Sequence, residues 1–188
     1  MESVPDREYS IDCVLPPNEE DTDLENLHCV SAARAACKEL PGDNEAEVVE
    51  DEELGKEVIE LMGLEAELVL PTSSILPMLV LHVKSTSHFF WICIDFVDNT
   101  KKYRTFTISN KQSIVSVDET EAKLPLIIDE GWQRLCFNVE ELTAKAFGSK
   151  YLTTYQVRVR GSVCVSKAFF QGHDYSDAEL PSHLRVLG

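Results

Sequence analysis

An alternation of apolar and polar side chains runs through the chain from residue 76 to residue 170. Between residues 89 and 96, Phe90, Ile92 and Ile94 fall on one face, and Trp91 and Cys93 fall on the other. A period of two is typical of a half-buried β-strand. The same pattern predicts further strands at 79–84, 106–108, 112–117, 123–128, 133–138, 155–160 and 163–170.

Two segments carry the spacing and end signals of helices. Asn138 stands three positions before Glu141, a variant of the capping box that begins a helix, and Gly148 is typical of a helix end. These two signals predict a helix from residue 139 to about residue 147. A second short helix is expected within residues 24–40. Its apolar and long side chains at helical spacing are Leu27, Val30, Arg34 and Cys37.

Residues 51–70 fit two different structures. Leu54, Val58 and Leu61 form a helical stripe after an acidic start, and periodicity alone favours a helix here. The same region, interrupted by Gly63, also fits two short strands. Periodicity therefore leaves both structures open.

Turn residues separate the predicted strands at close spacing. Asp98-Asn99-Thr100 and Asp129-Glu130-Gly131 are typical turns, and near the end Ser176 and Glu179 repeat the capping pattern before Pro181. Many short strands with turns between them predict a mainly β fold. We expect an antiparallel β-sandwich or jelly-roll-like domain with one or two short helices and an acidic N-terminal arm.

Charge is distributed very unevenly along the 188 residues. The net charge is −16, and residues 1–60 contain 19 acidic side chains against 4 basic ones. Residues 61–188 are nearly neutral, with 14 acidic and 13 basic side chains. We therefore divide the chain into an acidic arm, residues 1–50, and a β-domain, residues 51–188, and we expect the domain to stay folded without the arm. Repulsion from phosphates disfavours nucleic acid as a partner, whereas a basic protein surface suits the arm.

No motif for catalysis, metal binding or membrane insertion is present in the sequence. The six cysteines form no CxxC pair, the five histidines have no metal-ligand spacing, and no GxSxG motif occurs. Cys93, Cys136 and Cys164 lie in apolar runs typical of buried thiols. No run of 18 apolar residues occurs, and the N-terminus does not resemble a signal peptide. We expect a cytosolic protein that is not an enzyme and has no cofactor and no membrane partner.

Six separate segments of the chain resemble the cilia- and flagella-associated protein 20 family. They are residues 76–80, 89–96, 109–113, 126–138 with its Asp-Glu-Gly-Trp turn, 146–151, and Tyr175-Ser176 with 179–181. The similarity runs from about residue 54 or 63 to residue 187. The strongly acidic N-terminal segment departs from the family, so the chain is similar to a divergent or lineage-specific member.

The resemblance implies a compact β-sandwich at the inner junction of ciliary doublet microtubules. Such a protein bridges the A- and B-tubules, contacts tubulin and neighbouring junction proteins, and has no enzymatic activity. The implied location is the axoneme of a cilium or flagellum, or the basal body. In the family, residues 51–70 correspond to strand. A centriolar or nuclear scaffold of the same family is the nearest alternative.

Basic side chains in two places are the candidates for contact with acidic tubulin surfaces. They are Lys101, Lys102, Arg104 and Lys111 around one hairpin, and Arg158 and Arg160 on one strand face. An ordinary solvated outer face is the alternative interpretation, and Lys101, Lys102 and Arg104 are expected to lie outside the core.

Aromatic residues suggest a function from a different class, a ligand- or carbohydrate-binding module. Trp91, Trp132, Tyr103, Tyr151 and Tyr175 would then form a platform for sugars. We favour structural packing for them, with the ring of Trp132 holding the turn at Gly131 against the sheet.

Overall fold

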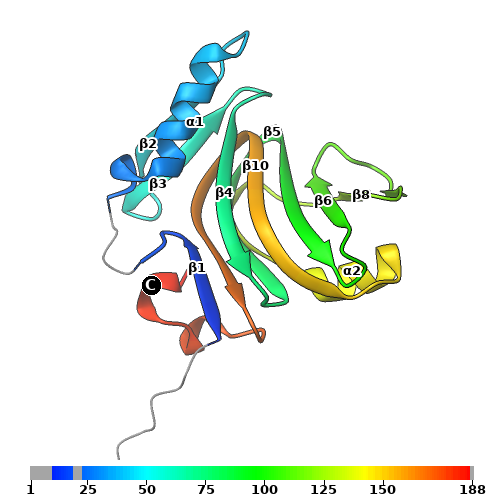
Figure 1. The fold of residues 1–188 in the computed structure, drawn as a ribbon. Coiled ribbons are helices and arrows are strands. Elements are labelled where there is room, and N and C mark those ends of the chain that lie inside the picture. Colours follow the sequence, from blue (N-terminus) through cyan, green and yellow to red (C-terminus); the bar gives the residue numbers. More distant parts are fainter. Residues whose placement is uncertain (1–9, 19–22, 187–188) are drawn as a thin grey trace, which may run out of the picture.

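The computed structural model describes residues 10–18 and 23–186, and their strands form one ten-stranded sheet (Figure 1). The strands are β1 (Ile11–Leu15), β2 (Glu45–Asp51), β3 (Lys56–Met62), β4 (Glu67–Ser74), β5 (Met78–Asp98), β6 (Tyr103–Ser109), β7 (Ser116–Val117), β8 (Glu121–Pro125), β9 (Gly131–Asn138) and β10 (Tyr151–Gln171). The helices are α1 (His28–Glu39), α2 (Val139–Phe147) and the 3₁₀ turns η1 (Leu24–Asn26), η2 (Asp177–Glu179) and η3 (Ser182–Leu184). Among the described strands, β6 and β8 pair in parallel and every other pair is antiparallel.

Two long central strands, β5 and β10, organise the sheet. They pair with each other along their length, whereas the outer edge of β5 pairs first with β9 and then with β6. The sequence pattern predicted four separate strands here, because polar residues interrupt each alternation. In the structure, each pair of predicted strands is one continuous strand that bends. At Gly161, with φ of +104°, an added Cβ would lie 2.5 Å from the Phe89 carbonyl oxygen, so only glycine allows the two strands to approach at this bend.

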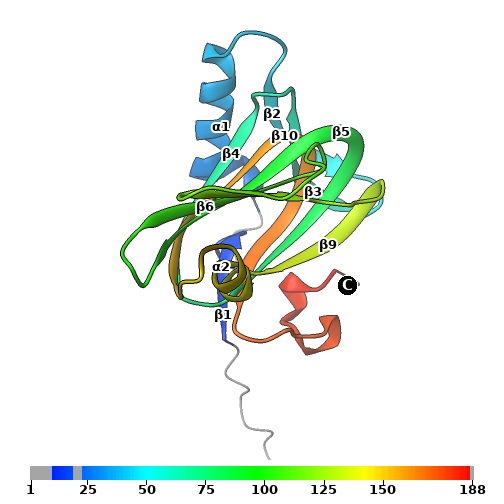
Figure 2. The ribbon, with the colours of Figure 1, turned by 90° about the vertical axis from the view of Figure 1, so that its right-hand side faces the viewer.

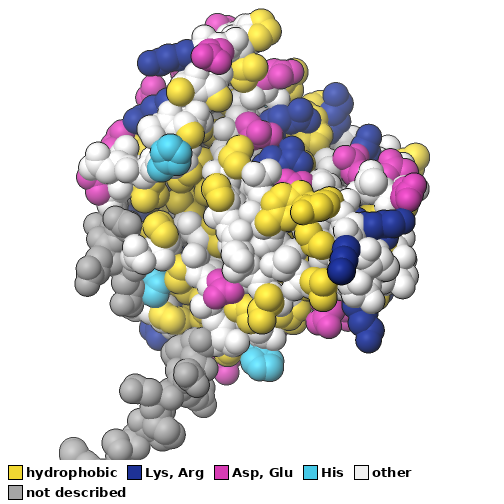
Figure 3. Space-filling view, in the orientation of Figure 1, with side chains coloured by type: hydrophobic (Ala, Val, Ile, Leu, Met, Phe, Trp, Pro, Cys, Tyr) yellow, Lys and Arg dark blue, Asp and Glu magenta, His cyan; other side chains and the backbone are white. Residues whose placement is uncertain are grey.

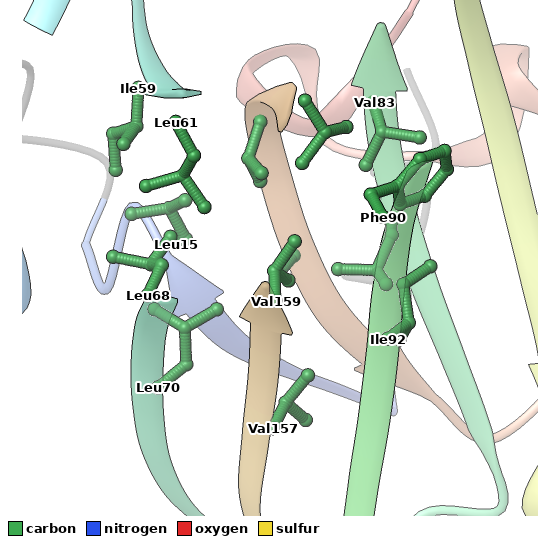
Figure 4. Close-up of a cluster of buried hydrophobic side chains, with 14 of the residues drawn as sticks. Leu15, Ile59, Leu61, Leu68, Leu70, Val83, Phe90, Ile92, Val157 and Val159 are labelled. Atoms are coloured by element: carbon green, nitrogen blue, oxygen red, sulfur yellow. The ribbon is translucent and has the colours of Figure 1, made fainter. Parts of the chain in front are cut away.

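The main hydrophobic core lies on the inner side of the bent sheet (Figure 4). Buried side chains from both ends of the long strands, such as Val83 and Ile92, belong to one hydrophobic cluster with Leu15, Leu68 and Val159. Full burial of such side chains stabilises the fold by about 1.5–3 kcal/mol each. The predicted mainly β, largely antiparallel fold is confirmed. The finer prediction of a sandwich or jelly roll stays a prediction, because the described strands belong to one hydrogen-bonded sheet.

The N-terminal segment differs from the expected acidic arm wherever the structure describes it. β1 pairs with β10, and Leu15, Leu24, Val30 and Cys37 belong to the main core. α1, which confirms the helix predicted within residues 24–40, lies against β2 and β4 (Figure 1). The proposed boundary after residue 50 falls inside β2. Because the core includes this segment, removing residues 1–50 is now expected to unfold the chain, contrary to the expectation from charge.

Residues 51–70 form strands, as the family resemblance implied, and the helical stripe is misleading. β2 and β3 make a hairpin in which Val48 faces Ile59 and Ala46 faces Leu61. α1 covers this apolar side of the hairpin. Strand pairing therefore buries the apolar residues that a helix would have placed on one stripe.

Local end signals predicted the remaining elements well. The Asn138 side chain accepts a hydrogen bond from the Glu141 backbone N–H at 3.0 Å, and Gly148 ends α2 with φ of +64°, so both predicted caps are confirmed. η2 has the capping box predicted between Ser176 and Glu179. The strand predicted at 112–117 is shorter than expected, because β7 contains two residues.

Candidate protein-docking face

The outer face of β4, β10, β5 and β6 carries polar side chains in aligned rows. The register places Arg158 of β10 beside Cys93 of β5, and Arg160 beside Trp91. Alternation along each strand directs these side chains away from the core, on the side opposite Val157 and Val159. Figure 3 shows Lys and Arg side chains gathered over the part of the sheet where β5 and β10 lie in Figure 1.

Asp95 neutralises Arg158 on this face. The Arg158 Nε and Nη2 atoms donate to the two Asp95 oxygens at 2.7 and 2.9 Å, and Gln156 and Thr105 donate to the same carboxylate. Burial by itself raises the pKa of Asp95, but the hydrogen bonds from Arg158, Thr105 and Gln156 outweigh it and leave the pKa below its ordinary value. The same pair raises the pKa of Arg158. Arg158 is therefore a structural member of the face whose charge is largely satisfied.

Trp91 contacts two of the basic candidates, Arg160 and Lys111, which lie far apart in the sequence. The Arg160 guanidinium carbon is 4.5 Å from the centroid of the Trp91 ring, and Lys111 Nζ is 5.9 Å from it. Neither cation forms an ion pair with a carboxylate of the described residues. The face of the indole ring attracts both cations and holds their charges at the surface.

A hollow of about 340 Å³ adjoins this cluster. Trp91, Arg160 and Lys123 line it together with the acidic side chains Glu67 and Glu121. Lys123, which the sequence reasoning missed, reaches the face because β8 pairs in parallel with β6. No local sequence pattern predicts parallel pairing between two strands that are joined by a loop. We call Trp91, Lys111, Arg160 and Lys123 the cationic face.

Lys101 and Lys102 lie away from the cationic face. They occupy the turn between β5 and β6, so the length of β6, roughly 20 Å at strand rise, separates them from Lys111. Lys102 pairs with Glu119 at 3.0 Å, and Lys101 has φ of +61°. The candidates predicted around one hairpin therefore do not form one group.

Arg104 is buried, so the prediction that it lies outside the core is wrong. The residue is 7% exposed, and its Nε donates to Asp98 Oδ2 at 2.6 Å. The alternation of β6 places Arg104 on the same face as Phe106 and Ile108. Its guanidinium carbon lies 4.3 Å from the centroid of the Phe147 ring, which ties β6 to α2.

The aromatic residues suggested for sugar stacking are dispersed. Trp132 Nε1 donates to Asp51 at 3.1 Å, and its ring lies 4.8 Å from that of His82. The Tyr151 hydroxyl donates to the Ser74 carbonyl at 3.0 Å. Structural packing is therefore the function of Trp132 and Tyr151. Tyr103 contacts Tyr155 edge-on at 5.7 Å on the surface, a pair that the sequence did not suggest.

The thiols of Cys93 and Cys164 have the character of buried hydrophobic groups. Burial raises the pKa of Cys93, and burial followed by the nearby Glu60 raises the pKa of Cys164 to about 12. Cys136 is exposed, which corrects the expectation that it is buried. Within residues 10–18 and 23–186, no three His, Cys, Asp or Glu side chains are grouped so that they could hold a metal ion. No helix in the described part of the chain is long and apolar enough to cross a membrane.

Comparison with known proteins identifies the family. The family model of the CFA20 domain matches residues 31–188, and the chain belongs to this family. The chain is 27% identical over 148 residues to cilia- and flagella-associated protein 20 of Chlamydomonas reinhardtii, covering 74% of this chain and 78% of that protein. The protein of the same name from Paramecium tetraurelia is 26% identical with the same coverage, and that from Caenorhabditis elegans is 26% identical, covering 73% of this chain and 72% of that protein.

Proposed function

We propose that this chain is a non-catalytic structural component of ciliary or flagellar doublet microtubules. In this proposal it binds tubulin and neighbouring junction proteins and bridges the A- and B-tubules as a divergent inner-junction protein. Membership of the CFA20 domain family and relatives named for cilia and flagella support the ciliary assignment. The corresponding location is the cytoskeleton of the axoneme or the basal body.

The cationic face supports the tubulin contact most directly. Trp91 holds the charges of Arg160 and Lys111 on an open sheet face beside a hollow. Trp and Arg are the residues most often responsible for binding energy at protein interfaces. Lys123 pairs with Glu121 at 3.6 Å, so Arg160 and Lys111 are the cations of this face that would attract an acidic partner. Arg158 supports the face through Asp95, whereas Lys101 and Lys102, at the turn between β5 and β6, would contribute to a separate contact.

Co-sedimentation of the full chain with microtubules tests this contact. We expect Arg160→Glu and Lys111→Glu each to weaken binding about tenfold, the loss of roughly 1.4 kcal/mol. Lys38→Glu makes the same charge change on α1 and serves as the matched control. Raising the salt concentration should weaken wild-type binding. Equal binding by all three variants and the wild type would remove the cationic face from the proposal.

Imaging of a tagged copy tests the location independently of the binding face. We expect the protein in the axoneme or the basal body. A purely nuclear location would favour the scaffold alternative within the family. A carbohydrate-binding module is the alternative from another class, and the dispersed aromatic residues do not support it. Strong hits on a glycan array without microtubule binding would restore it.

The acidic N-terminal segment is proposed to meet a basic partner surface. In the structure, this segment presents exposed Glu45 and Glu47 on β2 as part of the folded domain. Deleting residues 1–50 would also remove core side chains such as Leu15 and Val30, so deletion is not a clean test. Charge substitutions on β2, such as Glu47→Gln, are the better experiment, because Glu47 is exposed.

A further inference from the structure

A groove of about 640 Å³ lies where β5 and β10 bend, beside the end of β3. The buried residues Leu61, Val163 and Cys164 contribute to its lining. Its rim carries three apolar side chains that remain open to solvent, namely Met62 (43% exposed), Leu64 (61%) and Phe89 (48%). This volume is in the range of pockets that bind ligands or side chains. Exposed apolar side chains grouped around a groove are typical of an interaction site.

Hydrogen bonds at the bends hold the walls of the groove in place. The Gly63 backbone N–H donates to Ser162 Oγ at 3.1 Å and joins β3 to β10. On the other side, the Asn110 side chain donates to the His88 carbonyl at 2.9 Å and accepts from the Phe90 N–H at 3.0 Å. A groove with fixed walls loses little conformational freedom when it binds, so even a short ligand can bind there.

One acidic side chain lines this groove, and two more lie next to it in the β2–β3 hairpin. Glu60 is part of its wall, Glu47 lies directly opposite Glu60 in the β2–β3 hairpin, and Glu45 lies opposite Met62. Like charges placed opposite each other across a strand pair are destabilising. None of these three carboxylates forms an ion pair with a described Lys or Arg. A bound cation from a partner would relieve this repulsion.

We propose that the groove binds a short segment of a partner protein in which apolar side chains stand next to Lys or Arg. The apolar side chains would enter between Met62, Leu64 and Phe89, and the cations would face Glu47 and Glu60. The net charge of −16 opposes a second copy of this chain as the occupant. The same carboxylates repel nucleic acid and anionic lipid headgroups. A cationic protein segment is the occupant that satisfies both the apolar rim and the charge.

Titration of the ¹⁵N-labelled full chain with a defined probe peptide tests this inference. The probe is a blocked peptide with two leucines between two pairs of lysines. We expect the changes in the protein's backbone amide chemical shifts to cluster at residues 61–64, 86–89 and 162–164. Binding should be weaker at higher salt. A peptide with glutamates in place of the lysines, and one with serines in place of the leucines, should each bind at least fivefold more weakly.

Variants on the protein separate apolar from charge contributions. We expect Leu64→Ser and Glu47→Gln each to weaken binding of the probe by about three- to tenfold. Ile127→Ser and Glu140→Gln make the same chemical changes at exposed positions elsewhere and should leave binding unchanged. Thermal unfolding of each variant verifies that the domain remains folded.

Three results would overturn the inference. The first is no binding of the probe, or shifts that cluster elsewhere. The second is equal binding of the lysine and glutamate peptides. The third is a concentration-dependent dimer that Leu64→Ser dissociates, because a second copy would then be the occupant. None of these results affects the cationic face, which is tested with microtubules and with different variants.

Discussion

Replacing Arg104 with methionine should destabilise this protein far more than the same change at Lys102. Both residues are basic. Lys102 directly precedes β6 and Arg104 is its second residue, but only Arg104 lies in the core. Arg104→Met keeps an unbranched side chain while removing the guanidinium that pairs with Asp98. It also removes the donor to the Glu119 carbonyl, so the buried Asp98 carboxylate and a partly buried carbonyl each lose a partner.

The magnitude follows from the surroundings of Asp98. This carboxylate is fully buried and accepts five hydrogen bonds, from Arg104 Nε, the Thr100 N–H and hydroxyl, the Lys102 N–H and the Ser149 hydroxyl. Removing one partner from a buried ion pair costs about 3–5 kcal/mol. For a domain of this size the loss lowers Tm by roughly 6–20 °C. Lys102 forms an exposed pair with Glu119, which contributes at most about 1 kcal/mol.

Acid titration gives a second measurement on the same pair. Burial alone raises the pKa of Asp98, but hydrogen bonds from Thr100, Ser149 and Arg104 outweigh it and hold the pKa well below its ordinary value. A carboxyl whose folded pKa is lowered stabilises the fold above the unfolded pKa, about 3.9. This contribution is lost as pH falls below that value, and Arg104→Met should make the loss smaller.

Urea unfolding followed by circular dichroism measures these effects. Lys102→Met is the matched control, because it removes a neighbouring positive charge from the surface. Microtubule binding of folded Arg104→Met should remain close to that of the wild type. The reasoning fails if the two variants are equally stable, or if Arg104→Met stays as stable as the wild type and loses microtubule binding instead.

Three further predictions concern other buried or capping groups. His82 is 1% exposed with both ring nitrogens unpaired among the described residues, and burial lowers its pKa to about 4. Between about pH 6.5 and pH 4, His82 binds a proton in the unfolded chain but not in the folded one, so the free energy of unfolding should fall by about 3 kcal/mol as pH drops through this range. Urea titrations at several pH values measure this loss, and His82→Leu should abolish it. Asn138→Ala removes the hydrogen bond to the Glu141 N–H and should cost about 1 kcal/mol in urea unfolding, whereas Asn138→Asp should restore most of it. Trp132→Phe leaves Asp51 without its indole donor and should cost about 1–3 kcal/mol by the same assay, and an unchanged midpoint would contradict a structural role.

The buried position of Arg104 was already present in the sequence pattern. Residues 104, 106 and 108 share one face of a strand, so alternation alone places Arg104 with Phe106 and Ile108. Its charge suggested the surface instead. The buried partner that makes its burial possible, Asp98, lies in what the sequence showed only as a turn. A buried charge is tolerated when its partner is in place, and residue type alone does not reveal that partner.

The cationic face was predicted in part. Lys111 and Arg160 were both candidates, but their meeting at Trp91 depends on the register of β5, β6 and β10. Lys123 was missed because the parallel pairing of β6 and β8 decides its position. A shift of one residue in register would have moved these side chains to the opposite face.

By itself, the sequence determined the features that depend on neighbours along the chain. The alternation defined most strands, and Asn138 and Gly148 defined α2, because side-chain period and end caps act over a few residues. Only the tertiary structure decided that the N-terminal segment joins the core, and that interrupted alternations are two continuous strands that bend. Both depend on contacts between residues far apart in the sequence, such as Gly161 against Phe89, which no local pattern records.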